Sequence, residues 1–572
     1  MQKEMIKFID ENKLNPFESA GKLRRKDKNI FITADAKSVF NKTLEKLSAN
    51  FVFSDTDNLW QVFPFTQDVE EIRERQKFFS GIEKRDNKFL KQLSKPRNWW
   101  KPKYSILVVT EDDKTFCELQ KLDIPCQFLN SQYDLEGLDS YDLIQVIDCD
   151  QFSSALERLP QSVFLDSIDE VYLERYLEIL SAWQKNLEMF DKNEANNGIK
   201  KIVSELTPLL KFLESKTSEK LEREQIDNAL ESINKEVEEE ITKLSISGMT
   251  LMSMLSKGKL PDDLARIAEG IIKKSNLPEH LFTIAIPVSL DEREVEKMIK
   301  EQNASEHTTL AESVKRKSTE LRAIPEKLAE LTNLLIYFDF CSGVSQIIQE
   351  NHVFPQISSD FYFSEAENIF LDKAQPISFS LDDSSRCSIL TGANSGGKTT
   401  LIEHIIQLIT FFQIGLPVKG NARMPTFSEI YYFAKNKGSA SKGAFETLLT
   451  QMASIKPGKT TLVLADEIES VTEPGVAGKI ISATAEFFVA KGCFLVIATH
   501  LGSEIQKSLP RFSRIDGIEA KGLDENFELI VDHNPVLGKL ANSTPELIIE
   551  KMARNSSEEY FQFLNDKIRG GN

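Results

Sequence analysis

The chain has 572 residues, several times the size of an average domain, so we expect three or four domains that each bury a core. Its 70 basic and 88 acidic residues leave a formal charge of −18, which excludes a uniformly basic protein that coats nucleic acid. The six cysteines form no CxxC pair, which argues against a disulfide framework or a zinc site and favours a reducing compartment.

No segment has the pattern of a signal peptide or a membrane span. The N-terminus, MQKEMIKFIDENK, is charged, and polar residues interrupt the most apolar long run, Leu401 to Val418. We therefore predict a cytoplasmic protein with no membrane partner.

The first part of the chain, residues 1–103, mixes short apolar runs with one predicted helix at 68–93, where apolar side chains recur at helical spacing. It ends in SKPRNWWKPKYS, whose prolines break any helix.

The pattern changes over residues 104–167. The apolar runs SILVVT, IPCQFLN, DLIQVID and SVFLD alternate with polar stretches and a helix-like DKTFCELQKL. This alternation predicts a small α/β unit with a parallel sheet. Because the acidic TEDDKTF lacks partner residues for a metal site, we favour a spacer or docking role for the unit.

Residues 168–345 are predicted to form long helices. Over 222–244, six apolar residues step by three or four and keep one narrow stripe on a helix face. A second stripe at 310–331 is expected to run back antiparallel and bury the shared seam. Between them, residues 245–298 form a compact interruption with one strand-like run, LFTIAIPVSL.

The last part, residues 346–572, again alternates strands and helices. CSILTG, TTLVLAD and CFLVIATH are continuous apolar runs, typical of parallel strands buried on both faces. GANSGGKT lies between the first run and an apolar helix and matches G-x-x-x-x-G-K-[ST]. The predicted phosphate-loop residues are Gly392, Ala393, Asn394, Ser395, Gly396, Gly397, Lys398, Thr399 and Thr400.

This glycine-rich loop is suited to hold a nucleoside triphosphate such as ATP. It can wrap so tightly that backbone N–H groups point at the phosphates, aided by the dipole of the following helix. Lys398 is expected to pair the β- and γ-phosphates, and Thr399 to supply a hydroxyl ligand to Mg²⁺. The alternative is a chance glycine-rich turn, against which the order of strand, loop and helix argues.

Two further strand ends carry candidate chemistry. The second apolar run ends in Asp466 and Glu467. We expect Asp466 to hold the Mg²⁺ ion and Glu467 to orient and polarise the attacking water. The third run ends in Thr499 and His500, where the histidine is placed to sense a γ-phosphate. Taken singly, these residues are also compatible with strand capping and packing. The predicted catalytic residues are Glu467, Lys398 and His500, and the predicted metal ligands are Thr399 and Asp466.

In this order, the motifs resemble the MutS family of ATPases. ILTGANSGGKTTLIEHI, TLVLADEIESVTEPGVAG and FLVIATH are similar to the family's nucleotide loop, acidic strand and histidine-ended strand. Upstream, VFPFTQDVEEIRERQKFF is similar to the opening of its core. The resemblance implies a multi-domain α and α/β fold: a long-helix core and lever domain (1–103 and 168–345, with a reduced clamp at 245–298), a small α/β insertion (104–167), and an ABC-like P-loop ATPase domain with C-terminal helices (346–572).

The chain also departs from the family pattern. Typical members present a Ser-Thr-Phe signature to nucleotide held by the partner subunit, whereas here Gly443 and Ala444 precede Phe445. Ser441 or Lys442 are candidates to replace the missing hydroxyls. The Phe-x-Glu matches lie in apparent helices without the mismatch-reading N-terminal domain, and no nuclease-like tail follows STPELIIEKMA. We therefore expect a reduced member of the family.

The resemblance implies a homodimer, joined through the ATPase domain, that embraces nucleic acid with a grip set by its ATP state. Our leading hypothesis is an ATP-hydrolysing protein that recognises double-stranded or branched DNA by shape in repair or recombination. Two alternatives stay open: an ATPase that acts on RNA assemblies such as ribosomes, and an ATP-gated structural dimer with little turnover. Candidate phosphate contacts are Lys88, Lys91, Lys95, Arg97, Lys101 and Lys103 beside Trp99 and Trp100, and Lys315, Arg316, Lys317 and Arg322.

Overall fold

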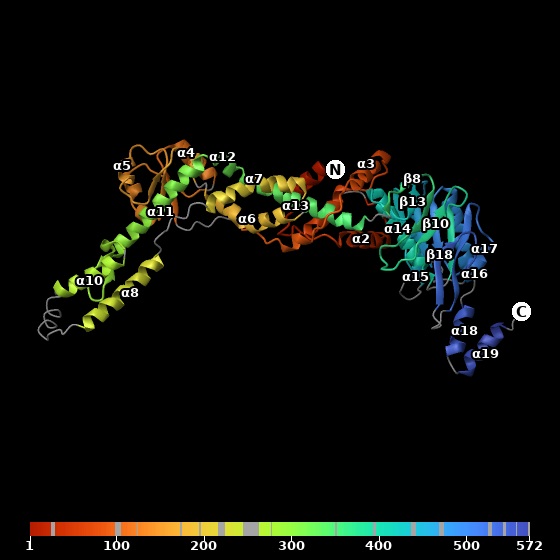
Figure 1. Ribbon diagram of the computed structural model, residues 1–572. Coiled ribbons are helices and arrows are strands. Elements are labelled where there is room, and N and C mark those ends of the chain that lie inside the picture. The colour runs from red at the N-terminus through yellow and green to blue at the C-terminus, as the bar shows by residue number, and fades with distance from the viewer. Residues whose placement is uncertain are drawn as a thin grey trace. The chain divides into compact units, whose positions relative to one another are not determined.

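The computed structural model describes residues 1–572 except 25–28, 98–104, 123, 172–173, 194–195, 215–222, 244–261, 276, 349–351, 393–395, 436–441, 468–473, 524–528, 542–544, 556–557 and 570–572. The chain is mixed α/β with parallel sheets, as the sequence predicts. It divides into two compact units (Figure 1), one formed by Met1–Gln92 together with Thr332–Asn572 and the other by Leu93–Leu331.

The main sheet of the first unit has six strands in the order β14-β15-β16-β11-β17-β18. All neighbouring strands are parallel except β17 and β18, which pair antiparallel. Every residue of β15 and β16 is buried, in agreement with their apolar sequences. The strands are β11 (Cys387–Gly392), β14 (Glu429–Phe433), β15 (Thr461–Asp466), β16 (Phe494–Ala498), β17 (Ser513–Leu523) and β18 (Leu529–Val536).

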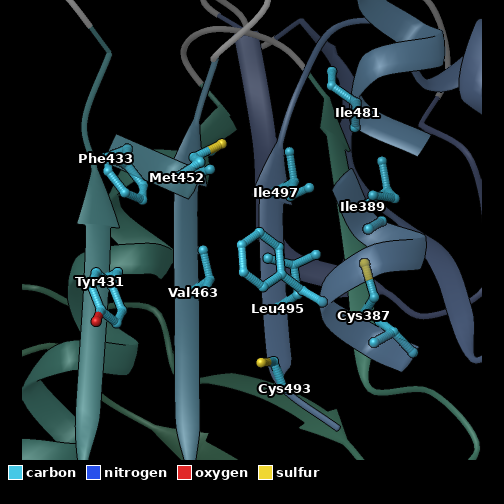
Figure 2. Close-up of a cluster of buried hydrophobic side chains, with 14 of the residues drawn as sticks. Cys387, Ile389, Tyr431, Phe433, Met452, Val463, Ile481, Cys493, Leu495 and Ile497 are labelled. Carbon is cyan, nitrogen blue, oxygen red and sulfur yellow. The ribbon is translucent and has the colours of Figure 1, made fainter. Parts of the chain in front are cut away.

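An apolar cluster covers one face of this sheet (Figure 2). Ile389, Val463 and Ile497 contribute from three neighbouring strands, while Met452 and Ile481 come from helices α15 (Lys442–Ala453) and α16 (Pro474–Ala490). Since these side chains are almost fully buried, their transfer from water is a main source of stability for this part of the fold.

Helix α14 (Lys398–Ile414) is buried almost throughout its length. The polar residues that interrupt its apolar sequence are buried with it: His404, Gln407 and Gln413 are each 0% exposed. The Gln413 amide donates to the Phe427 carbonyl at 3.0 Å and accepts from the Phe427 N–H at 3.1 Å. The two glutamines therefore satisfy buried backbone groups of neighbouring segments, which explains how an almost wholly buried helix carries them.

Helix α3 is shorter than the predicted helix at 68–93. It spans Val69–Ser80, begins at an Asp68 cap and ends at Gly81, and the 3₁₀ turn η2 (Lys88–Gln92) follows. The prediction was wrong between these elements because the chain there turns the Asn87 side chain into the core, where it is 3% exposed.

The remaining elements of the first unit surround the sheet and the buried helix. A second sheet has the order β10-β9-β13-β8, and β12 pairs with β7. The elements are α1 (Gln2–Glu11), α2 (Ala34–Ser48), η1 (Ser54–Val62), α13 (Ile324–Ile347, which begins before the unit boundary), β7 (His352–Val353), β8 (Gln356–Ile357), β9 (Phe361–Ala366), β10 (Ile377–Leu381), β12 (Val418–Lys419), β13 (Asn421–Met424), α17 (Gly502–Gln506), α18 (Pro545–Asn555) and α19 (Glu559–Arg569).

The second unit contains the predicted parallel sheet, in the order β2-β1-β3-β4. Its strands coincide with the four apolar runs read from the sequence, and DKTFCELQKL forms α4 (Asp113–Lys121) as predicted. The elements are β1 (Ile106–Thr110), β2 (Cys126–Phe128), η3 (Gln132–Leu135), η4 (Leu138–Ser140), β3 (Leu143–Val146), α5 (Ser153–Leu156), β4 (Ser162–Phe164) and η5 (Ile168–Glu170).

The long helices of the second unit are α6 (Glu174–Lys192), α7 (Asn197–Glu214), α8 (Arg223–Thr242), α10 (Asp262–Lys274) and α11 (Glu292–Lys315), followed by the short α12 (Ser318–Arg322). The predicted strand-like run LFTIAIPVSL forms two short antiparallel strands, β5 (Phe282–Thr283) and β6 (Ser289–Leu290), after the turn η6 (Glu279–Leu281).

The apolar stripe of α8 is buried, but its partners differ from those predicted. Ile226 and Ile233 pack in one cluster with Ile271 of α10 and Val295 near the start of α11. The predicted pairing with the stripe at 310–331 was therefore wrong. Because α11 has 24 residues, it is about 36 Å long, and the second stripe begins near its far end.

All six cysteines are free, in agreement with the expectation of no disulfide framework. Of the helices within the described ranges, none is both long and apolar enough to cross a membrane.

A buried carboxylate joins distant segments of the first unit. Asp339 on α13 is 0% exposed. Its carboxylate accepts hydrogen bonds from the Val52 N–H at 2.9 Å, the Phe53 N–H at 3.0 Å, the Thr56 hydroxyl at 2.7 Å and the Asn87 amide at 2.8 Å. Burial raises the pKa of Asp339, and these donors oppose that rise.

We predict that Asp339→Ala lowers the free energy of unfolding of this unit by about 3 kcal/mol or more, because it leaves buried donors without their acceptor. Thermal and urea unfolding, followed by circular dichroism, measure the change. The matched control is Asp372→Asn at an exposed carboxylate, which should leave the transition in place. An equally stable Asp339→Ala protein would contradict the structural role given to this residue.

Candidate nucleotide-binding site

Three neighbouring strands end at one edge of the main sheet. β15, β16 and β11 are adjacent and parallel. Asp466 pairs in register with Ala498, and Ala498 pairs in register with Leu390. The residues that follow these three positions therefore meet at the carboxyl edge, where ligands bind in open parallel sheets. This register brings together the phosphate loop, the two acids and His500.

Glycines shape both ends of the loop that are described. β11 ends at Gly392, with φ +137°, where a Cβ atom would lie 2.6 Å from the Ile518 carbonyl oxygen. Gly397, with φ +92°, immediately precedes the first residue of α14. Both positions are confined to glycine. The loop therefore leads directly into the N-terminus of a 17-residue helix. A helix N-terminus is a favourable place for an anion.

The predicted loop residues Ala393, Asn394 and Ser395 lie outside the described residues. Gly396 is described, and its carbonyl lies 2.9 Å from Nδ1 of His533 on β18. The backbone carbonyl of Thr400 lies 3.5 Å from the Asn368 amide nitrogen, which donates to it. The described parts of the loop and first helical turn are thus anchored to neighbouring segments.

Lys398 is almost fully buried at the start of α14, with 3% of its surface exposed. Its Nζ donates to the Gly392 carbonyl at 2.6 Å and lies 3.4 Å from Nε2 of His500. A buried ammonium group is costly unless it is paired. Here it also lies 3.9 Å from the Glu467 carboxylate, so the cation faces the centre of the candidate site.

Thr399 and Asp466 form the arrangement expected of a magnesium site. The Thr399 hydroxyl donates to Oδ2 of Asp466 at 2.5 Å, and Asp466 is 2% exposed. Among the described residues, Oδ1 of Asp466 has no hydrogen-bond partner. Burial raises the pKa of Asp466, and the Thr399 hydrogen bond opposes the rise. A hydroxyl and a buried, unsatisfied carboxylate oxygen are ligands that suit a hard cation such as Mg²⁺.

These two residues are too few to enclose a metal ion. Within the ranges that the structure describes, no three His, Cys, Asp or Glu side chains gather as a metal site. Since Mg²⁺ commonly takes one or two protein ligands together with phosphate oxygens and water, the residue set fits a metal that arrives with a nucleotide better than a permanently held one.

Glu467 lies just beyond β15, and a histidine and a lysine contact its carboxylate. Nε2 of His500 lies 2.7 Å from Oε1 of Glu467, and Lys435 forms an ion pair with Oε2. Burial alone would raise the pKa of Glu467, but the hydrogen bonds from Lys435 and His500 outweigh it and the pKa is lowered. Glu467 also has φ +49°, a conformation that is uncommon outside glycine and recurs at functional sites.

Thr499 forms hydrogen bonds with the backbone close to Glu467 and His500. It is 0% exposed, its N–H donates to the Leu390 carbonyl at 2.9 Å, and its hydroxyl accepts from the Leu501 N–H at 3.0 Å. These bonds extend the pairing of β16 with β11 and set the position from which His500 reaches Glu467.

Sequence reasoning missed two residues of this site. Lys435 follows β14, the neighbour of β15, and the parallel pairing of Phe433 with Ala465 brings it beside Glu467. Lys435 could have been predicted from the sequence, because it is a polar residue that closely follows an apolar strand. His533 had no such signal, since it comes from an antiparallel strand far along the chain.

The signature-like segment lies only partly within the described residues. Ser441 is outside them, and of Lys442, Gly443, Ala444 and Phe445 only the backbone, as the start of α15, is described.

Two residues of the predicted basic stretches form ion pairs with carboxylates. Residues 98–104, with both tryptophans, lie outside the described residues. Arg97 pairs with Glu178 at 3.2 Å, and Lys315 lies 3.1 Å from Glu170. These ion pairs favour a structural role for Arg97 and Lys315, which the sequence proposed as phosphate contacts.

The chain is 29% identical over 578 residues to a protein of Pyrococcus furiosus named "DNA-binding protein MutS2", an alignment that covers 93% of this chain and 98% of the relative. It is 23% identical over 357 residues to "Endonuclease MutS2" of Enterococcus faecalis, covering 59% of this chain and 44% of that protein.

A third relative, "DNA mismatch repair protein MutS" of Thermotoga neapolitana, is 32% identical over 126 residues, which cover 21% of this chain and 16% of the relative. No family model matches the chain. The match to the Pyrococcus furiosus protein extends over nearly the full length of both chains, and the other two carry the same family name. These matches support membership of the MutS family.

Proposed function

We propose that this chain binds ATP with Mg²⁺ and hydrolyses it, and that nucleotide binding governs its grip on DNA. The observation that carries the proposal is the meeting of Lys398, the Thr399–Asp466 pair and the Glu467–His500 pair at the ends of three adjacent strands. The proposal that the partner is DNA rests on the relatives, since the Pyrococcus furiosus protein is named as DNA-binding.

In this proposal, each residue of the site has a distinct task. The loop backbone and Lys398 hold the phosphates, with Lys398 placed at the β- and γ-positions. Thr399 and Asp466 hold Mg²⁺, which supplies neutralisation of phosphate charge when bound. Glu467 orients and polarises the attacking water, and His500 holds the Glu467 carboxylate and senses the γ-phosphate.

We further propose the domain assignment made from the sequence. Residues 1–103 and 168–345 form the core and levers, with a reduced clamp at 245–298, while 104–167 form an inserted α/β domain. Residues 346–572 form the ATPase domain, through which two copies associate. The protein acts on duplex or branched DNA in repair or recombination, reads phosphates and helix geometry, and works in the cytoplasm.

Glu467→Gln should reduce steady-state ATP hydrolysis by about 100-fold or more while ATP binding persists, because the amide cannot polarise water as the carboxylate does. Phosphate release and retained nucleotide are measured on the same preparation. Glu486→Gln, at an exposed position on α16, is the matched control. Undiminished turnover in Glu467→Gln would remove Glu467 from its assigned role.

Asp466→Asn should abolish most of the gain in ATP affinity that Mg²⁺ provides, since the buried anionic ligand is lost. The readout is the ratio of dissociation constants measured with EDTA and with Mg²⁺. Thr399→Val should lower the same ratio, whereas Thr399→Ser keeps the hydroxyl and should preserve it. A ratio that stays at the wild-type value in Asp466→Asn would show that this residue is not a metal ligand.

Shape recognition predicts that a four-way junction binds roughly tenfold more tightly than linear duplex of equal length, with little preference for a single mismatch over matched duplex. Fluorescence anisotropy at two salt concentrations, with and without ATP, tests this. A strong preference for the mismatch would contradict recognition by shape.

A further inference from the structure

Basic side chains contact both oxygens of the Glu467 carboxylate. Oε1 lies 2.7 Å from His500 Nε2 and 3.9 Å from Lys398 Nζ, while Oε2 pairs with Lys435 Nζ. Both lysines therefore reach the same carboxylate, although they come from different elements. Lys398 is committed to the phosphate loop in the proposed function, whereas Lys435 has no role in it.

Lys435 occupies this position because of its place in the sheet. β14 is parallel to β15, with Phe433 in register with Ala465, so Lys435 and Glu467 each lie two residues beyond a paired position. The chain at this point is anchored, since the Ala434 N–H donates to the Asp35 carboxylate at 3.0 Å. The Lys435 side chain thus extends toward the centre of the site from a backbone that this hydrogen bond holds in place.

The two partners of this ion pair differ in their access to solvent. The Lys435 side chain is 46% exposed, whereas that of Glu467 is 9% exposed. An ion pair with a half-exposed lysine is weak compared with a buried one, because water screens it and the long side chain loses rotamer freedom. Lys435 can therefore leave Glu467, which keeps His500 and Lys398 as partners, when a stronger anion comes within reach.

A terminal phosphate is such an anion. It carries more negative charge and more acceptor oxygens than a carboxylate, and its hydrogen bonds with ammonium groups are charge-assisted. In the proposed function the terminal phosphate is held by Lys398, whose Nζ lies 3.9 Å from the same Glu467 carboxylate. The ammonium group of Lys435 is then a neighbour of that phosphate.

We propose that Lys435 distinguishes a nucleoside triphosphate from a diphosphate by moving its ammonium group from Glu467 to the terminal phosphate. The inference rests on the proposed function and adds a residue to it. The exchange binds the triphosphate more tightly than the diphosphate and, in the same movement, frees one oxygen of Glu467 to receive the attacking water.

The test compares Lys435→Met with the wild-type chain in binding to ADP and to a non-hydrolysable ATP analogue, both with Mg²⁺, by isothermal titration calorimetry. We expect Lys435→Met to weaken binding of the analogue about tenfold, as the loss of one charge-assisted contact implies, and to leave ADP binding nearly unchanged. Lys435→Arg, which keeps a cation, should retain most of the discrimination.

The control is Lys456→Met. Lys456 is exposed and precedes β15, at the amino edge of the same sheet, and its substitution should alter neither affinity. Far-ultraviolet circular dichroism and the thermal midpoint of each variant establish that it is folded.

A purely structural role for Lys435, in which it only holds Glu467 in place, is tested in a Glu467→Gln background. If Lys435 contacts the phosphate, Lys435→Met still weakens analogue binding in that background. If the effect vanishes there, the lysine acts only through Glu467 and the inference is overturned.

The outcomes also separate this inference from the proposed function. A wild-type chain that binds neither nucleotide contradicts the function and the inference together. A wild-type chain that binds the analogue, with Lys435→Met unchanged or weakened equally for analogue and ADP, leaves the function standing and overturns the inference.

Discussion

The parallel register of β15, β16 and β11 is the constraint on which the candidate site depends. Asp466, Ala498 and Leu390 lie at one level across the three strands, so the next residue or two of each strand reaches the same small region. Hydrogen bonds continue the pairing past the strand ends, from Glu467 to Ala498 and from Thr499 to Leu390. A shift of one residue would turn every side chain of a strand to the opposite face and would separate Asp466 from Thr399.

The buried helix α14 provides the second part of this arrangement. It begins at Lys398, and its far end is closed by Gly415, where a Cβ atom would lie 2.5 Å from Cβ of Arg75. Arg75 is itself buried and donates to the Gln413 carbonyl at 3.1 Å. Because close packing fixes the far end of the helix, it helps to hold the N-terminus that faces the loop in place, as preorganised binding of an anion requires.

Charge at the site differs from charge over the whole chain. The formal charge of −18 describes a surface that repels polyanions at long range, yet Lys398, Lys435 and His500 converge on one glutamate. The buried Lys398–Glu467 pair is much less screened by salt than interactions across the surface. A strongly acidic protein can therefore still present a compact group of basic side chains to a phosphate, and the net charge carries little information about this site.

The local elements of the site were readable in the linear sequence. The strands, the loop and the buried helix can be predicted from apolar runs and from the glycines Gly392 and Gly397. Backbone geometry and burial depend mainly on residues that are close together in the sequence. For the same reason, the four strands of the small sheet were predicted correctly. Long-range partners were not: α8 packs on α10 and the start of α11, and Lys435 and His533 reach the site from β14 and β18. An apolar stripe specifies that a helix face is buried but not which surface covers it, and strand order in a sheet arises only when distant segments compete to pair. Only the tertiary structure determines these long-range partners, and with them which basic side chains contact Glu467.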